Sequence, residues 1–406
     1  MSGPAQTERS QLTYRNDCKR AAFQGILETG WQTFALVVAI RYFNAGESPK
    51  AFIAGAGPLG FLIAPLTLYL AGLFRARPGP ASGLIMGVAA LLLCGASLSG
   101  TLLLFTFFAV TSQMTAAQQG PLMLQVYTDN YRPGERGSRM SLPFMLTAGA
   151  AICFAFLGGR ILDMDLDYFR LIFAIMVLAA LANGFFMARI PSRSLSIKDV
   201  GNPWQNFSLI WKDKFFGYLL GSWMLLGLGN LITLPMRVEY LANPEFGINA
   251  DNTTIGILMI VVPAIARLGS TWIWGRLFDR LHFVSNRNLL NLCFLLGIAF
   301  FFFTRNFFLL TLGMAFTGLA QSGGKIFWSL WVTKIAPEDS KAASYMSVHM
   351  ALTGVRGSLA PFIGYWILSM SMPTTVAIVG MVLIVVAMAL FECVRGHGRL
   401  GSLHAH

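Results

Sequence analysis

The side chains of this sequence that could do chemistry are few, and most of them stand inside long apolar segments. Glu28 is the only acid that we place inside such a segment. The basic residues placed there are Arg267, Lys325, His349 and Arg356. Burying a charged group among apolar side chains costs free energy unless the group is neutralised, forms an ion pair or contacts water. Glu28 could therefore carry a proton or bind an amine, and the surplus of cations would attract an anion. Structural alternatives are an ion pair for Glu28 and, for the arginines, contacts with backbone carbonyls or the edge of the apolar layer.

A second group of polar residues in the same surroundings carries no charge. Amide side chains there can hydrogen-bond a solute, and Trp328, one turn from Lys325, can stack on an aromatic ring. Gly323 and Gly324 precede Lys325, and glycine within a helix costs about 1 kcal/mol. The pair either opens the helix at a binding site or lets a neighbouring helix approach closely. The amides are Gln32, Gln113, Gln118, Gln119, Asn230 and Gln321.

The sequence holds no pattern for a soluble catalytic site. It lacks the G-x-x-x-x-G-K-[ST] signature of a nucleotide-binding loop. Its five cysteines show no metal-ligand spacing and imply no disulfide framework. No polar region is long enough to fold as a separate catalytic domain. We therefore expect no enzyme activity, no cofactor and no metal.

The elements that position these residues are predicted to be membrane-spanning helices. Of the 406 residues, 55% are hydrophobic and only 12% are charged, with a mean hydropathy of +0.61, whereas a soluble domain carries about 25% charged residues. About 20 apolar residues are needed for a helix to cross the hydrocarbon core. The runs are continuous and do not alternate in polarity, which excludes barrel strands. Twelve segments qualify: 23–43, 51–73, 81–98, 102–127, 142–162, 169–187, 215–240, 254–274, 289–304, 307–332, 345–369 and 373–393.

The distribution of basic residues predicts the orientation. With a cytoplasmic N-terminus, 21 of the 30 Lys and Arg residues fall in cytoplasmic connections or tails, six in outer connections and three within spans. Cytoplasmic connections are enriched in Lys and Arg, so both termini are expected in the cytoplasm. This distribution also explains the net charge of +12 without a nucleic-acid partner. Acids cluster at Asp163, Asp165 and Asp167, in the outer connection between the fifth and sixth segments.

The chain divides near its midpoint at a long polar connection, in which residues 204–214 form an amphipathic stretch suited to the membrane surface. Pro133 follows the fourth segment as Pro337 follows the tenth, at an offset of 204 residues. This repetition favours two parallel halves. The predicted parts are a cytoplasmic N-terminal tail (1–20, too polar for a signal peptide), a six-helix bundle (21–190), a cytoplasmic linker (191–214), a second six-helix bundle (215–394) and a cytoplasmic tail (395–406).

The connection between the eighth and ninth segments reads Gly275-Arg-Leu-Phe-Asp279-Arg280. Together with the span count and the half-length repeat, it resembles the major facilitator superfamily, whose loop signature is G-x-x-x-D-R followed by basic residues. The resemblance covers essentially the whole chain. It implies an all-α membrane protein of twelve transmembrane helices in two parallel six-helix pseudo-repeats, with both termini cytoplasmic.

The resemblance implies a latch for one conformation, formed by Gly275, Asp279 and Arg280. The glycine permits two helices to approach closely, and the carboxylate at the helix end can pair with a basic residue or cap the next helix. The equivalent first-half stretch keeps Arg75 and Arg77 but lacks the aspartate.

The resemblance also implies that the first, fourth, seventh and tenth spans line a central cavity and that the two halves rock around it. The candidate substrate or coupling residues are Glu28, Gln32, Gln113, Gln118, Gln119, Asn230, Gln321, Lys325 and Trp328, with His349 and Arg356 from the eleventh span.

We therefore expect a monomeric secondary active transporter in the inner (plasma) membrane, surrounded by lipid and moving a small organic anion or zwitterion. Protons are the expected coupling ion, as in a symporter. Two alternatives stay open. One is an efflux pump for amphipathic compounds, since the many Met and Phe residues would provide an adaptable cavity. The other is a protein of this type that no longer transports and serves as a sensor or assembly factor, because the first-half aspartate is missing.

Overall fold

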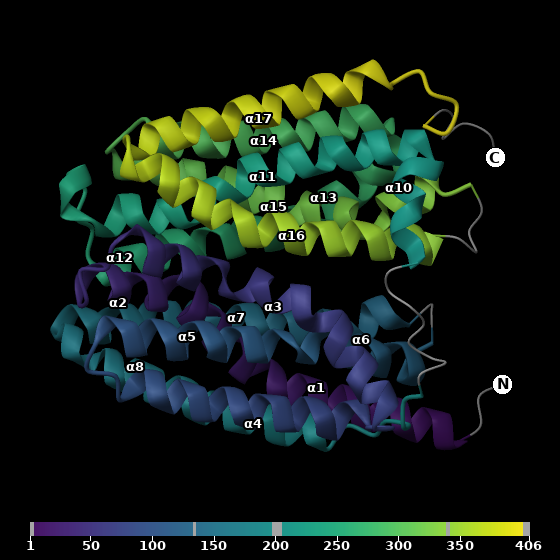
Figure 1. Ribbon diagram of the computed structural model, residues 1–406, viewed down its shortest axis with the longest axis horizontal. Helices are drawn as coiled ribbons and strands as arrows, with labels where there is room; N and C mark the ends of the chain where they lie inside the picture. Colours follow the sequence, from purple (N-terminus) through teal and green to yellow (C-terminus); the bar gives the residue numbers. More distant parts are fainter. Residues whose placement is uncertain (1–3, 133–134, 197–204, 338–341, 401–406) are drawn as a thin grey trace. The chain divides into compact units, whose positions relative to one another are not determined.

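The computed structural model describes residues 4–132, 135–196, 205–337 and 342–400 (Figure 1). Within these ranges every regular element is a helix and none is a strand. The chain forms two compact units, which are described separately. Unit 1 comprises Met1–Asn202 and Ala250–Ile257, and unit 2 comprises Pro203–Asn249 and Leu258–His406.

Unit 1 is a bundle of long helices in which α4 packs on α8, α1 packs on α7, and α5 contacts both α3 and α4. Glycines bring these helices close together. A Cβ on Gly25 of α1 would lie 2.2 Å from the carbonyl oxygen of Thr147 on α7, and one on Gly83 would lie 2.7 Å from the carbonyl oxygen of Gly184 on α8. Its helices are α1 (Pro4–Thr29), η1 (Gly30–Phe34), α2 (Ala35–Arg41), α3 (Glu47–Leu73), α4 (Pro78–Ser97), α5 (Leu102–Ala117), α6 (Gln119–Asn130), α7 (Arg136–Met164), η2 (Leu166–Tyr168), α8 (Phe169–Ala188) and α12 (Asn252–Gly256).

Unit 2 is a second helical bundle, in which α11 packs against α16 and α17 while α15 packs against α13 and α14. Its elements are η3 (Gln205–Ser208), α10 (Leu209–Lys212), α11 (Lys214–Ala242), η4 (Pro244–Phe246), α13 (Val262–Arg280), α14 (Phe283–Phe302), α15 (Phe307–Ile335), α16 (Ala342–Ser369) and α17 (Pro373–Cys393). The π turn η5 (Ile257–Val261) joins α12 to α13.

Asp213 anchors the beginning of α11. Its carboxylate accepts hydrogen bonds from the backbone N–H of Phe216 at 3.1 Å, the Tyr345 hydroxyl at 2.8 Å and Arg399 Nη1 at 2.6 Å. Burial acts to raise the pKa of this carboxyl, but these hydrogen bonds outweigh it and hold the pKa below its ordinary value. The ionised side chain therefore ties the starts of α11 and α16 to the segment that follows α17.

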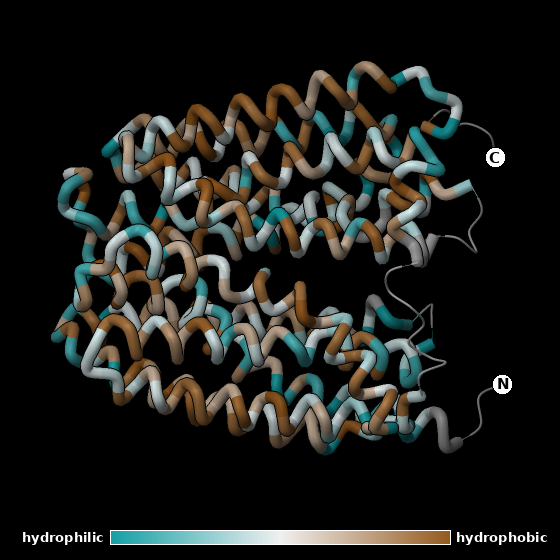
Figure 2. The backbone as a smooth tube through the Cα atoms, viewed as in Figure 1, coloured by the Kyte–Doolittle hydropathy of each residue, from teal (hydrophilic) through white to brown (hydrophobic). Residues whose placement is uncertain are grey.

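The apolar faces of these helices suit a bilayer. Within the described residues, nine helices are long and apolar enough to cross a membrane, and Figure 2 shows apolar residues running along the length of α17. Large apolar side chains such as Leu84, Leu103, Phe308 and Trp366 are largely exposed, as expected where lipid is the solvent. The chain is thus a multi-pass membrane protein. The nine helices are Glu47–Leu73, Pro78–Ser97, Ser138–Met164, Leu166–Ala188, Lys214–Ala242, Asn252–Phe278, Phe283–Phe302, Phe307–Trp328 and Pro373–Cys393.

The other three predicted spans, 23–43, 102–127 and 345–369, also coincide with helices. The first is interrupted by the π turn Gly30–Phe34, the second breaks between α5 and α6 at Gln118, and the third carries His349 and Arg356. The count of twelve spans and the side on which the termini lie remain predictions.

Our expectation that Glu28 is the only acid within a span is wrong. Glu239 lies near the end of α11 and has no exposed surface. Its carboxylate accepts hydrogen bonds from Asn243 Nδ2 at 2.9 Å and from the Tyr365 hydroxyl of α16 at 3.4 Å. A single acid near the end of an apolar run can therefore lie within the helix, because neighbouring side chains can hydrogen-bond its carboxylate.

Arg237, two residues earlier on α11, is also fully buried. Its guanidinium lies 5.9 Å from the ring centroid of Phe301 on α14, and none of its three nitrogens has a hydrogen-bond partner among the described residues. The end of α11 therefore brings two charged groups into the interior of unit 2.

Candidate functional site

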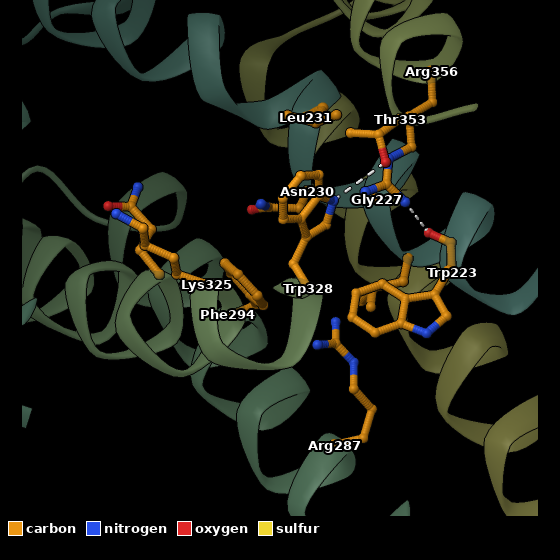
Figure 3. A pocket seen from close by; sticks show the side chains of 13 residues that line it. Trp223, Gly227, Asn230, Leu231, Arg287, Phe294, Lys325, Trp328, Thr353 and Arg356 are labelled. Carbon is orange, nitrogen blue, oxygen red and sulfur yellow. Dashed lines mark hydrogen bonds between the residues drawn. The ribbon is translucent and has the colours of Figure 1, made fainter. Parts of the chain in front are cut away.

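A cavity of about 320 Å³ lies within unit 2 (Figure 3). Four helices, α11, α14, α15 and α16, contribute its described lining. Three of the lining residues are basic and none is an acid, so the cavity combines positive charge with largely apolar walls. The lining residues are Trp223, Leu226, Gly227, Asn230, Leu231, Arg287, Phe294, Gln321, Gly324, Lys325, Trp328, Thr353 and Arg356.

Arg356 of α16 lies flat against α11. Its Nη1 donates a short hydrogen bond to the backbone carbonyl of Trp223 (Figure 3), and its Nε has no partner among the described residues. This position depends on Gly227, since a Cβ there would lie only 2.3 Å from Arg356 Cζ. The glycine therefore makes room for the guanidinium.

We expect Gly227→Ala to weaken anion binding about tenfold or more, because the added methyl group must displace the guanidinium and a charge-assisted hydrogen bond contributes about 1.5–3 kcal/mol. Calorimetric titration of the purified protein with a carboxylate measures the change. Gly221→Ala on the same helix is the matched control, since a Cβ at Gly221 meets nothing within 4 Å. Equal affinity in the two variants would mean that Arg356 does not contact the anion.

Arg287 of α14 lies against the indole ring of the same tryptophan. Its guanidinium carbon lies 4.0 Å from the ring centroid of Trp223, a cation–π contact, and Figure 3 shows the two groups next to each other. The side chain is only 2% exposed, and its Nε and Nη1 lack hydrogen-bond partners in the described ranges. A buried, incompletely bonded cation of this kind costs several kcal/mol, which an incoming anion would offset.

His349 lies behind the cavity wall. Its ring is buried among three tryptophans, with centroid distances of 5.3 Å to Trp223, 5.7 Å to Trp328 and 5.1 Å to Trp331. Its Nε2 has no hydrogen-bond partner within the described part of the chain. Of these tryptophans, Trp223 and Trp328 line the cavity, so His349 is placed to support part of the cavity wall from behind.

The two glycines before Lys325 differ in their surroundings. A Cβ on Gly323 would lie 2.5 Å from Leu290 Cδ1 and 2.6 Å from the Trp274 ring, so this glycine allows close packing. A Cβ on Gly324 would meet only Phe294 Cζ, at 3.9 Å. Gly323 thus allows the neighbouring helices to pack closely on α15, whereas Gly324 leaves space at the cavity wall.

The structure brings together five of the residues singled out in the sequence. These are Asn230, Gln321, Lys325, Trp328 and Arg356.

Sequence reasoning missed Arg287, because the predicted span began only at residue 289 and the arginine was counted with the cytoplasmic connection. The helix in fact begins at Phe283. The sequence offered a signal, since Asn286 precedes Arg287 and Asn291 follows it by one helical turn, and the structure shows all three side chains buried.

The amides predicted in the first half have other surroundings. Gln118 is structural, because its Nε2 donates to the carbonyls of Gly60 at 2.7 Å and Met114 at 2.8 Å, and its Oε1 accepts from Thr67 Oγ1. Gln113 lies next to Gly57, where a Cβ would be 3.2 Å from its Nε2.

Three further residues predicted in the first half lie on α1, η1 and α6. Glu28 Oε1 accepts a hydrogen bond from Gln24 Nε2 at 3.1 Å. Gln32 is exposed and Gln119 half-buried.

A buried ionic cluster in α1 was not foreseen. Asp17 is 1% exposed, and one of its oxygens accepts hydrogen bonds from Arg20 Nε at 2.6 Å and the Tyr127 hydroxyl at 2.8 Å. Arg20 Nη2 also donates to the Tyr127 hydroxyl at 2.6 Å. The polar segment before Arg20 is thus helical from Pro4 onward and packs against α6, so polarity alone did not mark it as a separate tail.

The residues proposed as a latch lie at the end of α13. A Cβ on Gly275 would meet no described atom within 4 Å, and Arg280 is exposed. The side chain of Asp279 lies outside the described residues. Within unit 2 the glycine therefore does not mark a close approach of two helices.

A different polar contact joins α7 to the segment before α13, within unit 1. The carboxylate of Asp163 accepts hydrogen bonds from the backbone N–H groups of Asn252 at 2.6 Å and Thr253 at 3.0 Å, and from the Thr253 hydroxyl at 2.6 Å. Arg41 donates to Asn252 Oδ1 at 2.6 Å and to the carbonyl of Ala250. We call this set the Asp163 clasp. Sequence reasoning noted the acid but could not identify its partners.

Close backbone packing surrounds the clasp. A Cβ on Gly159 would lie 2.6 Å from Thr253 Cα, and one on Gly256 would lie 2.6 Å from the carbonyl oxygen of Ala155. The start of the predicted eighth span therefore rests directly on α7.

No protein-family model matches the chain, and no curated protein matches it. Solved structures do match. The nucleoside transporter NupG covers 94% of this chain and 98% of its own, with a TM-score of 0.73 and 14% identity. A bacterial homolog of the human lysosomal transporter Spinster covers 98% of each chain, with a TM-score of 0.67 and 12% identity. A D-xylose–proton symporter covers 94% of this chain and 96% of its own, with a TM-score of 0.64 and 14% identity. The chain therefore has the fold of these transporters, which is the fold that the resemblance to the major facilitator superfamily implied.

Proposed function

We propose that this protein is a secondary transporter that moves a small organic anion, or a zwitterion bound through its carboxylate, across the inner (plasma) membrane by alternating access. The observation that carries the proposal is the cavity of unit 2, which holds Arg287, Lys325 and Arg356 and no described acid. Arg287 and Arg356 each keep at least one guanidinium nitrogen without a hydrogen-bond partner in the described ranges, and an anion in an apolar cavity offsets the cost of such buried cations. The transporters of nucleosides and of D-xylose named above share the fold and support the mode of action.

The charge of the cavity also bears on the alternatives. An efflux pump for amphipathic compounds would need an acid to bind those that are cations, and the described lining provides none. A sensor or assembly factor could keep the cavity, but it would not move solute between compartments. Uptake of a mixture of labelled carboxylates and amines into proteoliposomes distinguishes the three. Accumulation of carboxylates alone supports the proposal, whereas uptake of amines alone, or of nothing, would refute it.

Alternating access gives the bound anion a mechanical role. Enclosing Arg287 and Arg356 without a counter-ion costs free energy. An anion bound between them lowers the free-energy cost of closing the cavity. Binding energy is thereby used to stabilise the occluded state. Protons are the proposed coupling ion, since entry of one proton with each monocarboxylate would be electroneutral.

We expect Glu28→Gln to abolish pH-driven accumulation while leaving substrate exchange largely intact. Glutamine resembles the protonated acid but cannot release a proton, and the Gln24 side chain can still hydrogen-bond its amide oxygen. Counterflow and gradient-driven uptake in the same proteoliposomes measure the two activities. Full gradient-driven uptake by Glu28→Gln would exclude Glu28 as the residue that carries the proton.

The proposed orientation places both termini in the cytoplasm. Single cysteines in a cysteine-free background report it: one at Glu245, between α11 and α12, should react with an impermeant reagent in intact cells. One at Ser194, after α8, should react only after permeabilisation. Both positions are exposed, so failure to react cannot be attributed to burial. The reverse pattern would overturn the orientation.

A further inference from the structure

We propose that the anion bound in the cavity of unit 2 is a one-ring aromatic carboxylate. Its carboxylate would meet Arg287 and Arg356, and its ring would pack on the wall formed by Phe294 and Trp328. The inference rests on the proposed function, which specifies only a small organic anion.

The charged end of the cavity is organised by one residue, Trp223. Its ring face carries the guanidinium of Arg287 at 4.0 Å, and its backbone carbonyl accepts the hydrogen bond from Arg356 Nη1. Both cations are thus fixed beside the same tryptophan before any ligand enters. Each still has at least one guanidinium nitrogen without a partner in the described ranges. Planar guanidinium groups recognise planar carboxylates by paired hydrogen bonds, so the pair favours a carboxylate.

The remainder of the cavity is lined mainly by one face of α15. Gln321, Gly324, Lys325 and Trp328 follow the spacing i, i+3, i+4, i+7 and all line the cavity. Gly324 lacks the packing role of its neighbour, since a Cβ there would approach only Phe294 Cζ, at 3.9 Å. The missing side chain leaves space beside Phe294. A planar ring can enter this space and lie against the aromatic side chains of the wall.

Trp328 is held in its orientation without a ligand. Its Nε1 donates to Thr353 Oγ1 at 3.3 Å (Figure 3), and its ring contacts the His349 ring at a centroid distance of 5.7 Å. A fixed indole face attracts the edge or face of another aromatic ring. Asn230 Oδ1 is buried without a partner in the described part of the chain, so its amide can pair with a polar ring substituent.

The size of the cavity limits the ligand to about one ring. Its volume of about 320 Å³ lies at the lower end of the roughly 300–1,000 Å³ found for pockets that enclose drug-sized ligands. The charged and aromatic parts together therefore select a compact molecule that carries both features.

Three probes test the inference with the purified full-length protein at constant ionic strength. Benzoate has the charge and the ring, cyclohexanecarboxylate has the charge without the aromatic ring, and benzamide has the ring without the charge. We expect benzoate to bind about threefold to tenfold more tightly than cyclohexanecarboxylate, because aromatic pairs contribute about 0.5–1.5 kcal/mol beyond burial. Benzamide is expected to bind too weakly to measure by calorimetry.

Variants of Trp328 test whether the aromatic wall of the cavity causes the preference for benzoate over cyclohexanecarboxylate. Trp328→Leu should bind benzoate and cyclohexanecarboxylate equally, whereas Trp328→Phe, which keeps an aromatic face, should retain part of the difference. Trp366→Leu is the matched control, since Trp366 is 62% exposed. Gel filtration and a thermal melt show whether each variant is folded, and Trp328→Phe keeps the test valid if the leucine variant is not.

The outcomes separate the inference from the proposed function. Equal affinity of the wild type for benzoate and cyclohexanecarboxylate would overturn the aromatic preference and leave anion transport standing. Binding of benzamide as tight as that of benzoate would overturn both. If no probe binds while proteoliposomes accumulate other carboxylates, the substrate is not aromatic and the inference is wrong.

Discussion

Replacing Arg287 with glutamine is expected to remove most of the affinity of the cavity for organic anions and to leave the folded protein at least as stable as before. Loss of a charge-assisted hydrogen bond costs about 1.5–3 kcal/mol, or roughly 10- to 150-fold in affinity. The unliganded protein loses a cation–π contact with Trp223 of up to about 2 kcal/mol, but it is relieved of a buried charge whose desolvation costs several kcal/mol. Weaker binding without loss of stability is therefore the expected result.

Arg276→Gln is the matched control for this prediction. Arg276 also stacks on a tryptophan, Trp272, at 4.5 Å, but both side chains are exposed. Thermal melts with and without a carboxylate, combined with uptake into proteoliposomes, compare the two variants. If Arg287→Gln unfolds at a much lower temperature and the remaining folded protein binds anions normally, Arg287 is a structural residue.

The second large effect is expected at the Asp163 clasp. Asp163→Asn removes the charge and at least one of the three hydrogen bonds that the carboxylate accepts from Asn252 and Thr253, at an expected cost of about 2 kcal/mol or more. Residues 250–257 should then separate from α7 more often, and backbone amide exchange in this segment should accelerate about 30-fold. Hydrogen exchange followed by mass spectrometry of peptides covering residues 250–257 measures it.

Asp165→Asn provides the comparison, since Asp165 lies two residues away and its carboxylate accepts a hydrogen bond from the backbone N–H of Asp167, at 2.9 Å, rather than from residues 250–257 in the described part of unit 1. In Asp165→Asn, backbone amide exchange in residues 250–257 should be as slow as in the wild type. Unchanged amide exchange in Asp163→Asn would show that the clasp does not hold the segment.

Sequence reasoning identified the cavity best where a polar residue stood alone in an apolar run. Lys325 and Arg356 are of this kind, and both line the cavity. Arg287 and Asp17 were missed for one common reason: hydropathy reports which residues face lipid, and it underestimates the length of a helix whose end contacts protein. α14 begins six residues before its predicted span and α1 begins at Pro4. In the sequence alone, polar residues that are buried at such helix ends look like residues of a polar loop between helices.

Contacts between distant residues were beyond the sequence for a different reason. Asp163 and Thr253 are 90 residues apart, and neither has a local pattern that specifies the other. Gln118 shows the opposite error, because an amide in an apolar run was expected to face substrate, whereas it hydrogen-bonds the backbone of α3. An uncharged polar residue can be satisfied by a neighbouring helix, so its presence alone does not distinguish structure from binding.

The charged end of α11 also bears on how the second unit is assembled during synthesis. A charged residue within a spanning helix costs up to about 2.5–3.5 kcal/mol on insertion into the bilayer, and α11 carries both Arg237 and Glu239. Tyr365, which hydrogen-bonds Glu239, is made 126 residues later, and Phe301, which lies under Arg237, also follows. Until α14 and α16 have been made, these contacts are missing. Burial of the end of α11 within unit 2 therefore depends on helices that are synthesised later.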